Sequence, residues 1–527
     1  ACLNQFGDTL LVGTYGCEIM EVDLRVGQSR TLIKGHYTPN RGRTVTNEIW
    51  GLEAFPDGDT YATASDDGTL RIWSISQRAQ LHSIRFSRDE VITENEKVRC
   101  LSLHPRGRLL AVGFKDGSFG ILDTSSWEFT VRKKCAREMI SQVKFSPDGS
   151  KLAVGSNDNN IDIYTVPEFN KVGECRGHSS YITHIDWSCD SQFLQSNCGA
   201  YELLFWDANT AKQIPSGASM LRDEDWGTWS CVIGWPVQGI FPPYSDGTDV
   251  NAVERSKSSK VLASADDFGQ VKLFRYPCPE KNSAFNVYHG HSSHVTNLAF
   301  TGDYLISVGG NDKSIFQWRY LEEEEELVST EGASEVEDFF EIDEIGKGDQ
   351  FLAVKPWKGE VEASRPSNLE LSPDHKDAPQ DSLSLLKVLG FRSFDSRNNL
   401  KVTRAGKIVY PAAALGVVMD PSSSLQEFFT GHQEDVVCLA IHPFKDLVAT
   451  GQMARTGKSR EIDLFVWDTE TLEAVSQLSG FHRKAIRHVG FSPDGSLLLS
   501  VGEDSDHSLA VYDWKHKRLV CSSKVDK

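Results

Sequence analysis

Apolar and polar residues alternate in short runs along most of the chain, and the runs recur about every 40 residues. One copy runs from a Phe-Pro-Asp-Gly turn at residues 55–58, through two alternating stretches separated by an Asp-Asp-Gly turn, to Trp73. Similar copies begin at Phe145 and at Phe491. Alternation of this kind is typical of strands with one buried face. Its period predicts β-propellers, whose blades are four-stranded sheets.

Each predicted blade carries residues for a buried polar network. A His before the blade, a Ser or Thr, the Asp of the second turn and the closing Trp can form such a network, which is favourable only when every member is satisfied. The segment that closes at Trp206 departs from this pattern, because Ala200 occupies the place of the turn Asp. The structural candidates are Asp67, Trp73, Asp158, His178, Trp206, Asp267, His291, Asp312, Trp318, His432 and Trp467.

The sixth blade-like segment is interrupted between residues 230 and 260. Pro242 and Pro243 cannot both lie in a central strand, so this text predicts an insertion that loops out of the blade. Loops on a rigid scaffold often carry binding residues. The insertion is therefore either a binding loop or a plain connection.

Composition describes a large protein without a membrane-spanning helix. The chain has 527 residues, too many for one ordinary domain, and no run of eighteen apolar residues. It lacks an initiator Met and a signal peptide, and we interpret it as an excised fragment. The eleven cysteines form no C-x-x-C pair, which favours a reduced intracellular protein over a disulfide scaffold.

Negative charge is concentrated in one segment. The net charge is −19, and twelve acidic residues with no basic one lie between residues 321 and 346. The remainder of the chain is only mildly acidic, which gives no electrostatic basis for binding nucleic acid. The acidic run is either a self-repelling spacer or, with Phe339 and Phe340 inside it, a segment that docks on a basic groove.

No arrangement of residues predicts catalysis, a cofactor or a metal. Asp267-Phe268-Gly269 spells a magnesium-binding motif of protein kinases, but the other kinase motifs are missing and the triplet lies at a blade turn. There is no P-loop, no G-x-S-x-G and no H-E-x-x-H, and no Cys or His has ligand spacing. We therefore expect a binding protein rather than an enzyme.

Basic clusters are the candidate partner-binding residues, although each can also be an ordinary solvated surface. One cluster lies at a blade edge and consists of Arg132, Lys133 and Lys134. A second lies in a long loop between strands and consists of Arg455, Lys458 and Arg460. A third follows the last blade, at Lys515, Lys517 and Arg518. The second is the strongest candidate, because it is expected to protrude and has no acidic residue until Glu461.

The text after the acidic run resembles the HELP motif of the echinoderm microtubule-associated protein-like family. The segments that carry the resemblance are residues 354–359 (VKPWKG), 390–400 (GFRSFDSRNNL) and 406–410 (GKIVY), followed by blade text at 431–432, 438–443 and 449–452. Residues 262–269 and 309–313 are similar to later blades of the same family. The resemblance therefore covers nearly the whole chain.

This resemblance implies tandem WD40-type β-propellers, an all-β fold, with a HELP segment built into it. We expect a propeller of about seven blades at 1–320, an acidic linker at 321–348, the HELP segment and a first blade at 349–430, and further blades of an incomplete second propeller at 431–527. Later blades that precede a HELP segment imply a junction between two tandem units.

The same resemblance implies a non-enzymatic scaffold in the cytoplasm, on the microtubule cytoskeleton, a cilium or axoneme included. It would bind tubulin or microtubules through its propellers and modulate microtubule assembly or organisation, with no nucleic acid, membrane or cofactor among its partners. The alternative is a general WD40 adaptor in a ciliary or signalling complex that does not contact tubulin.

Overall fold

The structure is a computed structural model that describes residues 1–4, 7–38, 46–86, 92–241, 248–322, 356–454, 462–504 and 508–524. Within these residues it contains ten antiparallel four-stranded sheets, which confirms the all-β propeller prediction. Two short α-helices are present, α1 (Gly217–Met220) and α2 (Pro356–Ala363), together with 3₁₀ turns at Glu94–Glu96 and Trp235–Ile240. Pro242 and Pro243, nearly all of the acidic run, and the loop cluster Arg455, Lys458 and Arg460 lie outside the described residues.

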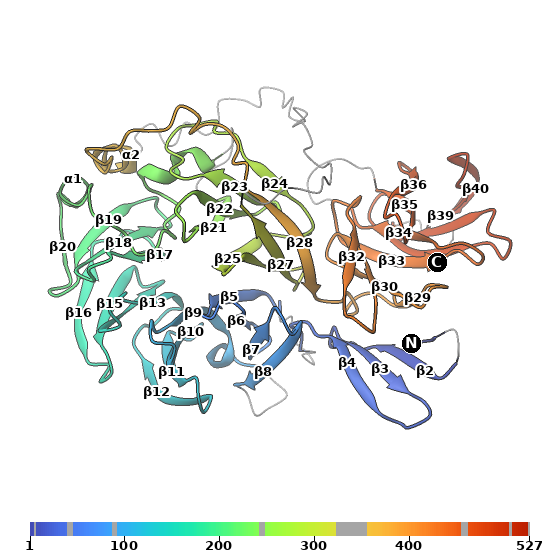
Figure 1. The fold of residues 1–527 in the computed structure, drawn as a ribbon, viewed down its shortest axis with the longest axis horizontal. Helices are drawn as coiled ribbons and strands as arrows, with labels where there is room; N and C mark the ends of the chain where they lie inside the picture. Colours follow the sequence, from blue (N-terminus) through green and yellow to red (C-terminus); the bar gives the residue numbers. More distant parts are fainter. Residues whose placement is uncertain are drawn as a thin grey trace.

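Six of the sheets follow one another around a ring (Figure 1). Their strands, sheet by sheet, are β5 (Ile49–Ala54), β6 (Thr60–Ser65), β7 (Thr69–Ser74), β8 (Ala79–Arg85); β9 (Val98–Leu103), β10 (Leu109–Phe114), β11 (Ser118–Asp123), β12 (Glu128–Lys134); β13 (Ile140–Phe145), β14 (Lys151–Ser156), β15 (Asn160–Thr165), β16 (Lys171–Arg176); β17 (Ile182–Trp187), β18 (Phe193–Cys198), β19 (Leu203–Asp207), β20 (Lys212–Gln213); β21 (Val250–Arg255), β22 (Val261–Asp266), β23 (Val271–Arg275), β24 (Asn286–Tyr288); and β25 (Val295–Thr301), β26 (Tyr304–Gly309), β27 (Ile315–Leu321), β28 (Ser382–Leu389).

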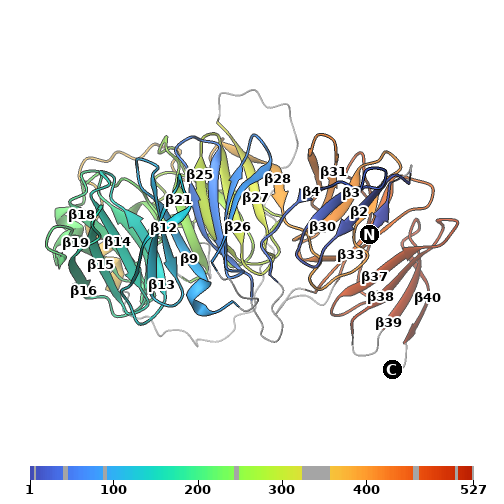
Figure 2. The same cartoon turned by 90° about the horizontal axis from the view of Figure 1, so that it is seen from below.

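The other four sheets form a separate array beside the ring, which Figure 2 shows from below. Their strands are β1 (Cys2–Leu3), β2 (Thr9–Gly13), β3 (Ile19–Asp23), β4 (Ser29–Ile33); β29 (Lys401–Val402), β30 (Ile408–Ala412), β31 (Leu415–Met419), β32 (Gln426–Phe429); β33 (Val436–Ile441), β34 (Leu447–Gln452), β35 (Leu464–Asp468), β36 (Ala474–Leu478); and β37 (Ile486–Phe491), β38 (Leu498–Gly502), β39 (Ser508–Asp513), β40 (Arg518–Lys524). We call these sheets the second array.

The gap between two sheets of the ring is filled by a stretch that overlaps the insertion predicted between residues 230 and 260 but begins earlier. Between the sheets of β17 and β21, residues 214–241 form α1, a 3₁₀ turn and irregular chain, and their tryptophans and aliphatic side chains form one apolar cluster with both sheets. Helix α2 adds the fully buried Val361 to this cluster. Across the gap, His184 Nε2 donates a hydrogen bond to the carbonyl of Asn251 at 3.1 Å. The described part of the insertion, up to residue 241, thus contributes largely to the core.

The placement of the first sheet differs from the expected propeller at residues 1–320. Strand β1 packs beside β29, so the first sheet lies in the second array and the ring holds six sheets instead of about seven blades. Phe391 packs against Gly13, where a Cβ atom would lie 2.6 Å from its ring. Ser393 Oγ also donates to the carbonyl of Thr14 at 2.6 Å. Contacts with a segment almost 400 residues away therefore determine where this sheet lies.

The last sheet of the ring is completed from the other side of the acidic run. Strand β28 pairs with β27, so that Val388 lies opposite Phe316 and Leu385 lies opposite Trp318. Lys387, Val388 and Leu389 are all buried, so the end of β28 is covered on both faces. The fourth and outer strand of this sheet therefore comes from residues that follow the acidic run. The expected domain boundary between 320 and 349 does not separate two bodies, because strands before and after it pair in one sheet.

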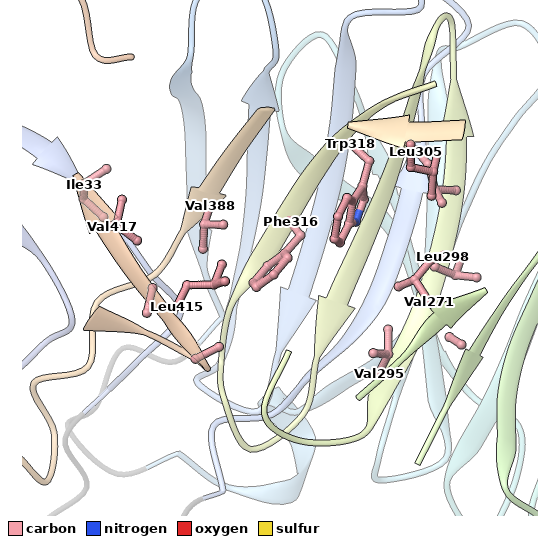
Figure 3. Packing of buried hydrophobic residues seen from close by; sticks show 14 of the residues in the cluster. Ile33, Val271, Val295, Leu298, Leu305, Phe316, Trp318, Val388, Leu415 and Val417 are labelled. Atoms are coloured by element: carbon pink, nitrogen blue, oxygen red, sulfur yellow. The ribbon is translucent and has the colours of Figure 1, made fainter. Parts of the chain in front are cut away.

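One apolar cluster extends from the ring into the second array (Figure 3). It joins Val295, Phe316 and Val388 of the ring to Leu415 and Ile33 of the array. At the same place the amide of Ala414 donates to the carbonyl of Gly290 at 3.0 Å. A continuous core of this kind favours a fixed arrangement of the two bodies over free movement.

We expect Phe316→Ala to lower the free energy of unfolding of the ring by about 3–5 kcal/mol, because it removes a fully buried ring from the cluster that the two bodies share. Chemical unfolding followed by tryptophan fluorescence measures the change. The matched control is Phe268→Ala in a turn of the same ring, where the side chain is 50% exposed and the expected change is below about 0.5 kcal/mol. Equal effects of the two substitutions would contradict the shared core.

Candidate functional site

A network of hydrogen bonds joins four buried side chains in the sheet of β5–β8. His36 Nδ1 lies 3.0 Å from Asp67 Oδ2, and its Nε2 lies 2.8 Å from Thr63 Oγ1. Trp73 Nε1 donates to the same Thr63 oxygen at 2.7 Å. Burial alone would raise the pKa of Asp67, but the neighbouring His36 and Arg71 outweigh this effect and lower the pKa to about 2. Since a carboxylate only accepts, the imidazole proton sits on Nδ1, and the threonine hydroxyl donates to Nε2.

The same network recurs in three more sheets with different partners for the imidazole Nδ1. In the sheet of β25–β28 the partner is Asp312 at 2.8 Å. In the sheet of β17–β20 it is Glu202 at 3.1 Å, and in the sheet of β33–β36 it is Gln452 at 2.8 Å. The members are His291, Ser307 and Trp318; His178, Ser196 and Trp206; and His432, Thr450 and Trp467. Sequence reasoning missed Glu202 and Gln452, because it searched only for an Asp in the turn.

The structure corrects the assignment of Asp267. Its carboxylate is exposed and accepts from Asn251 Nδ2 at 2.8 Å. The buried acid of this sheet is Asp266, which accepts from Lys272 Nζ at 2.9 Å. The strand pairing shows that both turns have the same length, and Phe268 rather than Asp267 occupies the place of Asp67. Asp158 is half-buried and accepts from the Arg137 amide at 2.7 Å.

The basic cluster at the blade edge lies on β12, the outermost strand of its sheet. All three side chains are exposed but engaged. The guanidinium of Arg132 lies 4.3 Å from the ring centroid of Phe114. Lys133 Nζ donates to the carbonyl of Phe169 at 3.2 Å, and Lys134 Nζ donates to that of Asp116. These contacts fix the direction of three positive charges at the side of the ring without removing them from solvent.

Four charged side chains occupy the same place on inner strands of the ring. They are the fifth residues of β5, β13, β17 and β21, namely Glu53, Lys144, Asp186 and Glu254. Burial raises the pKa of Glu53 to about 7 and that of Glu254 to about 8. Lys144 Nζ lies 3.4 Å from Asp186 Oδ1 and helps to keep the pKa of that buried carboxyl low. Sequence reasoning missed this group, because strands about forty residues apart bring it together.

The segment after β28 forms the junction between the ring and the second array. Arg392 is 7% exposed and makes ion pairs with Asp395 at 2.7 Å and with Asp435 at 2.5 Å. Phe394 lies between cations and rings: Lys313 Nζ is 4.0 Å from its centroid, and Tyr37 stacks on it at 5.6 Å. Because these partners come from both bodies, this segment determines how they meet.

The described residues include no helix that is long and apolar enough to span a membrane. All eleven cysteines are unpaired, and several of them, Cys100 and Cys438 included, are buried.

Three segments of the chain match known protein families. Residues 49–320 match the second β-propeller of echinoderm microtubule-associated proteins, beginning at the first residue of β5. Residues 378–417 match the HELP motif, and residues 425–527 match the first β-propeller of the same proteins. The match to a second propeller thus precedes the match to a first propeller, with the HELP motif between them.

Curated relatives carry the corresponding names. The chain is 42% identical over 321 residues to echinoderm microtubule-associated protein-like 2 of Homo sapiens, which covers 60% of this chain and 46% of the relative. It is 40% identical over 327 residues to echinoderm microtubule-associated protein-like 3 of Mus musculus, covering 61% and 34%. It is 42% identical over 318 residues to the 77 kDa echinoderm microtubule-associated protein of Lytechinus variegatus, covering 59% and 45%. The chain spans less than half the length of each of these relatives.

We expect acid to weaken the network of His432. Burial lowers the pKa of His432 to about 4 from 6.5, so between these values the unfolded state binds the proton and the folded state does not. Stability therefore falls as the pH drops from 6.5 to 4, by about 3 kcal/mol. The free-energy gap between the wild type and His432→Gln, measured by chemical unfolding, should narrow by this amount between pH 7 and pH 4.

The control for this titration is His516→Gln. The side chain of His516 is 77% exposed, so its substitution should change stability little at either pH. A gap between wild type and His432→Gln that does not change with pH would contradict the neutral, buried state of His432.

Proposed function

This chain belongs to the echinoderm microtubule-associated protein family, and on that premise we propose that it is a non-enzymatic scaffold that binds tubulin or microtubules through its propeller surfaces and modulates microtubule assembly or organisation. The observation that carries the proposal is the HELP segment, matched at 378–417, which forms both an edge strand of the ring and the junction with the second array. Such a junction suits a rigid binding surface larger than one propeller.

The proposal extends to the organisation of the parent protein. The order second propeller, HELP motif, first propeller supports a chain that crosses the junction between two tandem units. The acidic run at 321–346 would then be a spacer at this junction. We place the protein in the cytoplasm, on the microtubule cytoskeleton, a cilium or an axoneme included.

Charge supports a limited contact with an acidic partner surface such as that of tubulin. The chain as a whole is acidic, so attraction requires local basic patches. The cluster of Arg132, Lys133 and Lys134 provides one patch, on the outermost strand of a ring sheet. Arg455, Lys458 and Arg460 provide the second, in a segment with no acidic residue before Glu461.

Co-sedimentation of the chain with purified microtubules at two salt concentrations tests the proposal. Binding that persists at moderate salt would favour shaped contacts over diffuse attraction. Absence of pelleting at both salt concentrations would contradict direct binding to the microtubule and would favour the alternative, a WD40 adaptor without tubulin contact.

Replacing Arg455, Lys458 and Arg460 together with Glu should weaken microtubule pelleting by about tenfold, or about 1.4 kcal/mol, because three attractive charges become repulsive. The matched variant carries Glu at 132, 133 and 134, and so makes the same change in net charge at the ring edge. Pelleting that is unchanged in the first variant would dismiss the loop. Losses in both variants would assign both patches to the contact, and unchanged pelleting of the second variant would dismiss the patch at the ring edge.

A further inference from the structure

The sheet of β17–β20 departs from the other networks at two linked positions. Ala200 replaces the turn Asp, and the carboxylate that meets His178 comes instead from Glu202, immediately before β19. The residue opposite Ile182 is Cys198. In the sheet of β5–β8 the corresponding residue is Ser65, which lies opposite Ile49.

These changes bring three different metal-ligating atoms together. Glu202 Oε2 lies 3.1 Å from His178 Nδ1 and 3.1 Å from Cys198 Sγ. The ligand atoms of all three residues lie within 4.8 Å of one another. Bonds of 2.0–2.3 Å to a tetrahedral zinc ion separate its ligands by about 3.3–3.8 Å. The observed spacing therefore needs only small movements to accept an ion.

A neighbouring group forms a hydrogen bond with each of the three ligand side chains, as is usual around zinc ligands. His178 Nε2 lies 2.7 Å from Ser196 Oγ, which fixes the plane of the imidazole. Ser179 Oγ donates to Glu202 Oε1 at 2.7 Å, the oxygen that does not meet His178. The amide of Ala200 donates to Cys198 Sγ at 3.4 Å, a contact that would stabilise a thiolate.

We propose that His178, Cys198 and Glu202 bind one zinc ion. Nitrogen, thiolate and carboxylate ligands together suit Zn²⁺ better than Mg²⁺ or Ca²⁺. The Cys198 thiol loses its proton to solvent when the ion binds. The imidazole proton moves from Nδ1 to Nε2 and is donated to Ser196 Oγ, whose own hydroxyl proton turns away from the imidazole while the oxygen still accepts from Trp206 Nε1. His178 and Cys198 are buried, whereas the side chain of Glu202 is 27% exposed, which leaves the fourth position open to water or a partner's donor atom.

The competing explanation is that Glu202 only replaces Asp as the partner of the imidazole. It accounts for the distance of 3.1 Å between Glu202 and His178, and it treats the Cys198 thiol only as a hydrogen-bond donor to the same oxygen. The two explanations differ in one measurable property, the formation of a metal–sulfur bond.

Titration of the purified chain with Co²⁺, a spectroscopic substitute for Zn²⁺, tests the proposal. We expect the charge-transfer absorption of a cobalt–thiolate bond and intense tetrahedral d–d bands, saturating at one equivalent and displaced by Zn²⁺. Cys198→Ser should abolish the charge-transfer band and weaken binding at least tenfold. This variant should fold, because Ser65 occupies the same place in another sheet, and circular dichroism and the melting temperature without metal verify that it does.

Two further variants separate this site from adventitious thiol binding. Cys189→Ser, which removes an exposed thiol, should leave the cobalt spectrum unchanged. Glu202→Gln should weaken binding while the charge-transfer band from Cys198 remains at high Co²⁺. Absence of the band in the wild type, or its persistence in Cys198→Ser, would overturn the proposal.

Discussion

Pairing between β27 and β28 is the constraint on which the rest of the structure depends. Seven residue pairs join the two strands, although about sixty residues separate them along the chain. The entropy cost of such a long closure grows only slowly with its length, and the burial of Val388 and Leu389 offsets it. Once β28 is in place, the chain leaves it directly for Arg392 and the junction. Completion of the last sheet of the ring and attachment of the second array are therefore consequences of one strand.

The junction combines apolar and ionic contacts that reinforce each other. Phe316, Val388 and Leu415 form a continuous core between the bodies, and beside it Arg392 is buried with two carboxylates as partners. A buried guanidinium is costly unless its partners are held in position. The backbone of both bodies holds them here, since Asp435 immediately precedes β33 of the array and also accepts from Ser292 of the ring at 2.6 Å. The ion pairs of Arg392 therefore fix the geometry of the junction more than they add to its stability.

The local pattern of residues was sufficient to predict the strands and much of the polar network, whereas the pairing of segments far apart in the sequence could not be predicted from it. Alternation and turn residues predicted strands and closing aromatics such as Trp73 and Trp318, because these depend on neighbours within one blade. The position of β1 beside β29 and the pairing of β28 were missed, since each depends on segments hundreds of residues away or across the acidic run. Glu202 and Gln452 were missed for a different reason: any carboxylate or amide that reaches the imidazole satisfies it, wherever it lies in the turn. The basic loop at 455–460 remains a prediction from charge alone.

The sheet of β1–β4 has a consequence for the mechanics of the molecule. Because this sheet belongs to the second array, the chain crosses between the two bodies twice, once after Ile33 and once after Leu389. A single tether limits only how far two bodies can separate. The two crossings run side by side, because a Cβ atom on Gly35 would lie only 3.2 Å from the Cα atom of Gly390. A force that pulls the two bodies apart is therefore divided between two adjacent segments of chain, each of which carries part of the tension.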